Sequence, residues 1–198
     1  MKKTLLIGAL FLAGMGGTYA QVNYGVKAGV NFANLNFSED VEDLDPSTLT
    51  GFQAGIFANA ELAENFSVQP ELLYSAQGSV LAEEGDNSYK YKLSYLSLPV
   101  MARYQFWEGF RLEVGPQLGL LLSAKSVLDT DGGEAEEDVK DQTKSIDFGL
   151  AGGASYQLPM GIGVFARYYT GLTDISDGNE TDMTTKNNVA SAGLTYTF

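Results

Sequence analysis

The feature that most constrains this chain is a regular alternation of apolar residues with small or polar ones, which recurs in eight segments. The last segment, Asn188 to Phe198, shows it clearly: Ala190 and Leu194 fall on one face, and Ser191 and Thr195 fall on the other. A period of two residues is typical of a β-strand with one apolar side. The pattern therefore predicts an all-β protein in which each segment supplies one strand.

The other seven strands are predicted at 23–35, 50–61, 66–77, 89–106, 111–123, 146–158 and 162–172. Within 89–106 the apolar face changes phase: Tyr91, Leu93 and Tyr95 point outward first, and Leu96 and its even-numbered successors follow. We interpret the Tyr95–Leu96 step as a β-bulge.

The connections between these segments alternate in length. Residues 62–65, 107–109 and 159–161 form short links, whereas the other four links are long and polar. Short periplasmic turns and long external loops are typical of outer-membrane barrels. The pattern predicts an eight-stranded antiparallel up-and-down transmembrane β-barrel with both chain ends on the periplasmic side.

A soluble β-sandwich or a lipocalin-like barrel is the alternative fold. A lipocalin-like barrel needs large apolar side chains on its inner face. Here the second face of the strands is mostly Gly, Ser, Gln, Asn and charged residues. In addition, six aromatic residues lie near strand ends, where interfacial girdles occur in membrane barrels: Tyr24, Tyr74, Tyr104, Trp107, Tyr156 and Tyr196. Both observations favour the transmembrane barrel.

Residues 1–20 read as a cleaved signal peptide. Lys2 and Lys3 precede an apolar run from Thr4 to Leu12, and Thr18-Tyr19-Ala20 forms a small-x-small cleavage site. Residues 21–198 then form one barrel domain, and losing the two leader lysines changes the formal net charge from −13 to −15. So acidic a chain repels nucleic acid. Because the sequence has no Cys, neither a disulfide nor a lipoprotein anchor is expected.

Four stretches, at 24–31, 94–104, 115–120 and 166–175, carry a family resemblance. The chain resembles the outer-membrane β-barrel domain of Bacteroidota, often labelled "porin family", and the small barrels of the OmpA and OmpX type. One departure is Ser97, where the family commonly has an inward acidic residue.

The resemblance implies a location in the bacterial outer membrane, contact with lipid and lipopolysaccharide, and a monomer without a cofactor. It also implies recognition by the barrel-assembly machinery through the C-terminal strand that ends in Phe198. It does not imply an activity, since one fold hosts many functions.

Six charged residues are predicted on the inner face of the barrel: Lys27, Glu71, Arg103, Glu113, Asp147 and Arg167. All except Asp147 are expected near one level, where they could form one buried network. Charges in a narrow lumen must be paired or hydrated. We favour a structural ion-pair plug, because eight strands leave little interior space. The alternative is a selective pore lined by the same residues.

The long loops contain 19 of the 25 acidic residues. They are interpreted as a solvated rim, with divalent-cation capture and adhesion to a partner as alternatives. Asp129, Asp131 and Glu134 are weak metal candidates, because their spacing only partly matches a calcium loop. The chain contains no His, on which the known enzymes of this architecture rely, and no enzyme is expected. The predicted function is that of a structural or surface-interaction barrel; the alternative is a narrow passive channel for small solutes.

Overall fold

The computed structural model describes residues 21–37, 46–84, 87–130, 133–177 and 184–198. The predicted signal peptide lies outside the described residues. The strands are β1 (Val22–Phe37), β2 (Ser47–Ala63), β3 (Phe66–Glu84), β4 (Asn87–Trp107), β5 (Phe110–Thr130), β6 (Gly133–Asp138), β7 (Ile146–Gln157), β8 (Ile162–Gly171) and β9 (Thr185–Thr197). A short 3₁₀ helix, η1 (Lys140–Gln142), lies between β6 and β7.

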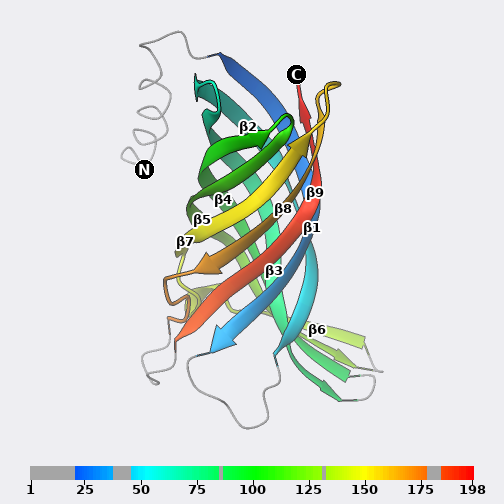
Figure 1. The fold of residues 1–198 in the computed structure, drawn as a ribbon. Helices are drawn as coiled ribbons and strands as arrows, with labels where there is room; N and C mark the ends of the chain where they lie inside the picture. Colours follow the sequence, from blue (N-terminus) through cyan, green and yellow to red (C-terminus); the bar gives the residue numbers. More distant parts are fainter. Residues whose placement is uncertain (1–20, 38–45, 85–86, 131–132, 178–183) are drawn as a thin grey trace.

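Eight of these strands close into one antiparallel barrel within the described residues (Figure 1). Neighbours around the barrel are β1, β2, β3, β4, β5, β7, β8 and β9, and β9 pairs back to β1. Each of the eight predicted segments overlaps one of these strands, so the predicted up-and-down barrel is confirmed. The start of β1 and the end of β9 lie at the same end as the short turns (Figure 1).

Glycines with a positive φ close two of the short turns. Gly109 has φ 77° and Gly161 has φ 86°, a left-handed conformation that residues with a side chain rarely adopt. The carbonyl of Gly109 accepts a hydrogen bond from the amide of Gln157 at 2.8 Å, and that of Gly161 accepts one from Thr197 at 2.9 Å. The turns are thereby tied to neighbouring strands and hold this rim of the barrel in register.

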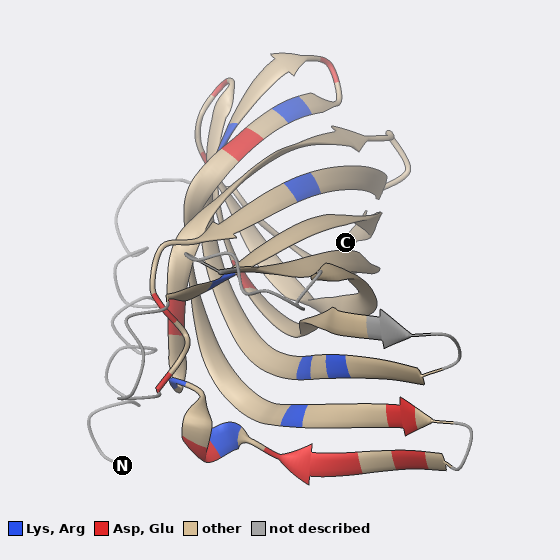
Figure 2. Cartoon of the chain, turned by 90° about the horizontal axis from the view of Figure 1, so that it is seen from below, with Lys and Arg blue, Asp and Glu red and all other residues tan. Residues whose placement is uncertain are grey.

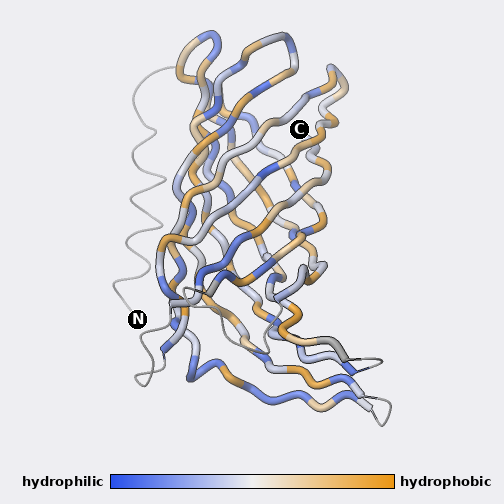
Figure 3. The backbone as a smooth tube through the Cα atoms, turned by 60° about the horizontal axis from the view of Figure 1, so that its bottom comes forward, coloured by the Kyte–Doolittle hydropathy of each residue, from blue (hydrophilic) through white to orange (hydrophobic). Residues whose placement is uncertain are grey.

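Hydrophobic and hydrophilic positions alternate along the barrel strands (Figure 3), and the exposed side chains include many large apolar ones whereas many polar ones are buried inside. Large apolar side chains such as Phe52, Ile56 and Leu194 are more than half exposed on the outer surface, where lipid would cover them. The six predicted girdle aromatics are all exposed on the described surface. Tyr104, Phe106, Trp107 and Phe110 pack ring against ring near one turn.

No helix among the described residues is both long and apolar enough to cross a membrane.

The predicted phase change in β4 is wrong. Leu93 and Tyr95 are each only 1% exposed and point into the lumen, on the same face as Ser97 and Met101. The alternation of β4 therefore continues without interruption. The inward direction of these side chains could not be predicted from the sequence, because apolar residues occur on both faces of β4 around Tyr95 and Leu96.

The irregularity that the sequence suggested lies in the partner strand. Ser94 pairs with Ser123, whereas Tyr95 pairs with Leu121, so Leu122 of β5 is the extra residue. A bulge strengthens the local twist of a strand. Beyond this bulge, β4 and β5 remain paired and continue toward the long connections.

Strands β3, β4 and β5 extend beyond the barrel at the long-connection end, and β6 pairs only with β5. The sequence did not predict β6. All six of its residues are exposed, and four of them are acidic. Figure 2 shows the acidic positions of β6 in red along the edge of the sheet, with lysine positions in blue on the strands next to it. Lys92 pairs with Glu134 at 2.8 Å, and Lys125 pairs with Glu136 at 2.5 Å.

Candidate functional site

Five charged side chains meet inside the barrel, each from a different strand. They are Lys27 of β1, Glu71 of β3, Arg103 of β4, Glu113 of β5 and Arg167 of β8, and we call them the lumen network. Each occupies an inward position of its strand and is at least 93% buried.

A glycine makes one of these meetings possible. Gly153 of β7 pairs with Glu113 on one side and with Arg167 on the other. Because glycine has no side chain, Arg167 can reach over β7 to Glu113 without a steric obstacle. Gly153 thus leaves room for the ion pair between Arg167 and Glu113 without taking part in it.

Arg167 is the centre of the network. Its Nη1 and Nη2 donate to the two carboxylate oxygens of Glu71, each at 2.8 Å. Its Nε and Nη2 donate to Oε1 of Glu113 at 2.8 and 2.6 Å. A guanidinium that binds two buried carboxylates in this way satisfies both, and bidentate pairs are the strongest ion pairs that proteins form. Arg167 therefore ties β3 and β5 to β8 across the lumen.

Lys27 and Gln69 complete the surroundings of Glu71. The Nζ of Lys27 lies 3.3 Å from Oε2 of Glu71 and 4.0 Å from the ring centroid of Phe165. The side-chain amide of Gln69 donates to Oε1 of Glu71 at 2.7 Å. A cation over an aromatic face is attracted by the ring, so Lys27 has two favourable partners.

Arg103 differs from the other two cations of the network. Its Nη1 donates to the amide oxygens of Asn59, at 3.2 Å, and of Gln69, and its Nη2 donates to the hydroxyl of Ser155 at 2.8 Å. Its Nε makes no hydrogen bond and lies 3.5 Å from Oε2 of Glu113. Arg103 thus belongs to the network mainly through neutral groups.

Asp147 lies apart from the lumen network. Its carboxylate accepts hydrogen bonds from Asn187 at 2.9 Å and from Thr173 at 3.1 Å. Asn187 also donates to the hydroxyl of Tyr95 at 3.2 Å. The structure therefore places five of the six predicted lumen residues together and assigns Asp147 to a separate polar group nearer the long connections.

Two clusters of buried, mostly apolar side chains, which we call the apolar layers, lie beyond the network. From Arg103 toward the long connections, the next inward residues of β4 include Met101 and then, further on, Tyr95 and Leu93. Met101 packs in one buried cluster with Ala33, Ala151, Tyr169 and Val189. Leu93 and Tyr95 belong to a second cluster with Leu35, Leu121, Ala124, Val139 and Ile175.

Sequence reasoning missed the outer of these layers. Two of its members, Val139 and Ile175, come from the long connections rather than from barrel strands. The strand pattern carries no signal for residues that fold back over the lumen. The inward apolar residues of β4 were the available signal, and they were assigned to the wrong face.

The weak metal candidates are not brought together. Asp129 pairs with Lys90 at 3.3 Å, and Glu134 pairs with Lys92 at 2.8 Å. Asp131 lies outside the described residues. Within the described ranges, no three His, Cys, Asp or Glu side chains are arranged to hold a metal ion.

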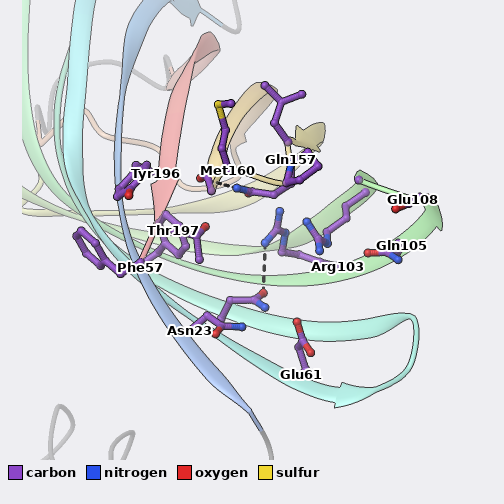
Figure 4. A pocket seen from close by; sticks show the side chains of 17 residues that line it. Asn23, Phe57, Glu61, Arg103, Gln105, Glu108, Gln157, Met160, Tyr196 and Thr197 are labelled. Carbon is purple, nitrogen blue, oxygen red and sulfur yellow. Dashed lines mark hydrogen bonds between the residues drawn. The ribbon is translucent and has the colours of Figure 1, made fainter.

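At the short-turn end the lumen opens into a cavity of about 700 Å³, which we call the vestibule. Arg103 lies at the inner side of the vestibule, with its guanidinium directed toward Asn59 and the cavity (Figure 4). Gln157 and Met160 border it from the β7–β8 turn (Figure 4). A smaller cavity of about 210 Å³, bordered by Leu35, Tyr91 and Ile175, lies at the long-connection end.

Comparison with known proteins gives one family and a common fold. A family model described as outer membrane protein beta-barrel domain matches residues 18–177. The structure is similar to Neisserial surface protein A, with 16% identity, a TM-score of 0.54, and coverage of 90% of this chain and 99% of that one. Ail, the attachment invasion locus protein of Yersinia pestis, has 14% identity, a TM-score of 0.52 and the same coverages. Comparison with curated proteins found no similar sequence.

Proposed function

The chain belongs to the outer membrane protein beta-barrel domain family, and on this premise we propose that it is a sealed barrel that acts at the cell surface rather than as a channel. Its location is the bacterial outer membrane. In this proposal residues 1–20 are the signal peptide and residues 21–198 the barrel. The barrel is a monomer in contact with lipid and lipopolysaccharide, the assembly machinery recognises its last strand, and the protein has no enzymatic activity.

One observation carries the sealed-lumen proposal. Arg167 of β8 binds Glu71 across the lumen and Glu113 over the intervening strand β7, with all four N–O distances between 2.6 and 2.8 Å. An aqueous pore requires a continuous path of water, and a buried guanidinium bound to two carboxylates supports the absence of such a path at that level. The two apolar layers beyond the network support the same conclusion, because water is poorly retained between packed apolar side chains.

The acidic residues of the outer end support a role in surface interaction. Glu134, Glu136, Glu137 and Asp138 are exposed on β6. Electrostatic complementarity determines which partners approach such a surface. We therefore expect a partner that presents positive charge, such as a basic protein segment.

This expectation separates the chain from one structural neighbour. Ail of Yersinia pestis has been crystallised in complex with the heparin analogue sucrose octasulfate. A polysulfated ligand should be repelled by the acidic rim of this protein. Equilibrium binding of sucrose octasulfate to the barrel in detergent micelles, at about 0.15 M salt, should give no saturable signal; saturable binding would contradict the acidic-rim proposal.

The alternative function is a narrow passive channel. The vestibule favours this alternative, because the cavity opens the lumen from the short-turn end. Liposome swelling distinguishes the two functions. Liposomes containing the refolded barrel should keep their volume in an isotonic solution of a small sugar, as protein-free liposomes do. Swelling at a rate that rises with the amount of protein would replace the sealed barrel with the channel.

A further inference from the structure

The vestibule is a blind pocket whose inner end carries unbalanced charge. The lumen network contains three cations, Lys27, Arg103 and Arg167, but only two carboxylates, Glu71 and Glu113. Its formal charge is therefore +1. An unbalanced charge inside a protein is costly unless a counter-charge compensates it.

Of the three cations, Arg103 has the weakest carboxylate contact, because only its Nε lies near one, 3.5 Å from Oε2 of Glu113. Arg167 and Lys27 each donate hydrogen bonds to a carboxylate, whereas Arg103 donates only to the neutral groups of Asn59, Gln69 and Ser155. Its Nε hydrogen is buried and has no hydrogen-bond acceptor. Arg103 is also the one member of the network that lines the vestibule.

A second cation lines the same cavity. Arg111 of β5 is only partly buried, and its guanidinium is near enough to repel that of Arg103. Glu61, on the outer part of the cavity, attracts Arg111, but two like charges at the inner part still favour a negatively charged group close to both. The walls add a second requirement, because Leu158 and Met160 of the β7–β8 turn border the vestibule with apolar side chains, and Phe57 of β2 borders it from another side.

The outer part of the vestibule limits how much negative charge an occupant can carry. Glu61 and Glu108 also line the cavity and are exposed to solvent. They would repel an anion with two or more charges more strongly than an anion with one. A single negative charge also matches the +1 charge of the network.

We propose that the vestibule binds a small periplasmic molecule with one carboxylate group, held between Arg103 and Arg111, and with an apolar part against Leu158 and Met160. Short-turn ends of outer-membrane barrels face the periplasm, so the occupant would enter from that side. The sealed lumen makes this a binding site rather than a passage. The inference does not depend on any partner at the outer surface.

Nuclear magnetic resonance can test this site directly, because the chain contains three arginines, Arg103, Arg111 and Arg167. Their Nε–Hε signals would be followed in the refolded barrel in micelles during titration with benzoate, with its uncharged analogue benzamide, and with inorganic phosphate. Benzoate should shift the Arg103 and Arg111 signals saturably and leave the Arg167 signal in place. Benzamide and phosphate should cause no comparable shift.

Variants assign the binding to the two arginines. Arg111→Gln should weaken benzoate binding about tenfold or more, because a charge-assisted hydrogen bond is lost. Lys144→Gln, which removes a cation at the opposite end, is the matched control and should bind benzoate as the wild type does. Arg103→Gln should weaken binding at least as much as Arg111→Gln, and the heat-dependent gel migration of each variant verifies that the barrel is folded.

Three results would overturn the proposal. The first is the absence of any benzoate-induced shift at Arg103. The second is an equal response to benzamide, which would remove the role of the charge. The third is phosphate binding as tight as benzoate binding, which would show a site for inorganic anions without a contribution from the apolar wall.

Discussion

At the scale of single residues, Arg167 donates more hydrogen bonds to carboxylates than any other charged side chain among the described residues. It satisfies both carboxylates of the lumen network, so its loss leaves Glu71 and Glu113 buried without their principal partner. Breaking a buried ion pair by removing one partner commonly costs about 3–5 kcal/mol. The lumen network is therefore expected to contribute strongly to the specific closure of the barrel.

We predict that Arg167→Gln lowers the free energy of unfolding by about 3 kcal/mol or more. Urea titration in lipid vesicles measures this change, with the fluorescence of Trp107, the single Trp of the chain, as the signal. Lys144→Gln removes an exposed ion pair and should cost less than about 1 kcal/mol. Equal effects of the two substitutions would contradict a stabilising role for the network.

Asp174, in the connection after β8, gives a prediction about pH. Burial raises the pKa of its carboxyl group, but hydrogen bonds from Lys144 and from the amides of Thr185 and Ser176 outweigh burial, so that the net shift is downward from 3.8. A lowered pKa in the folded state means that the carboxylate stabilises the fold above pH 3.8. This contribution is lost as the pH falls below that value.

The amide signals of Thr185 and Ser176 should therefore titrate together below pH 3.8, and both should lose hydrogen-exchange protection there. In the Asp174→Asn variant this transition should be absent. A transition of both amides centred above pH 4 would show that the ion pair with Lys144 does not control this connection.

At the scale of the elements, the sequence predicted most of the barrel but little of what closes it. Period-two alternation and the lengths of the links specify eight strands, because one face must meet lipid and each short link must be a turn. The inward charges of Lys27 and Arg167 followed from the same alternation. What could not be predicted depends on contacts between distant segments, such as the packing of Val139 and Ile175 on Leu93.

The orientation of β4 is a prediction at this scale. The chain has no Cys, so single cysteines at Leu93 and Leu98 can be labelled with nitroxides without a background signal. Leu93 points into the lumen and is 1% exposed, whereas Leu98 lies on the alternate face. The label at 98 should collide readily with oxygen dissolved in lipid, and the label at 93 should not. The reverse order would restore the phase change that the sequence suggested.

At the scale of the whole molecule, the barrel combines a vestibule at one end, the lumen network, two apolar layers and an acidic extension at the other end. In the sealed-barrel proposal the network and the layers are independent barriers, because they consist of different residues at different levels of β4. Removing one barrier should therefore leave the other intact. The double variant Arg103→Ala, Arg167→Ala is expected to be less stable but still closed to ions.

Single-channel conductance in a planar bilayer shows whether the lumen is sealed. The refolded wild-type barrel should show no discrete openings in about 1 M KCl, and the Arg103→Ala, Arg167→Ala variant should remain silent as long as the apolar layers persist. Discrete openings of the wild type, with a current that scales with salt concentration, would contradict the sealed barrel. The lumen network would then be the lining of a channel.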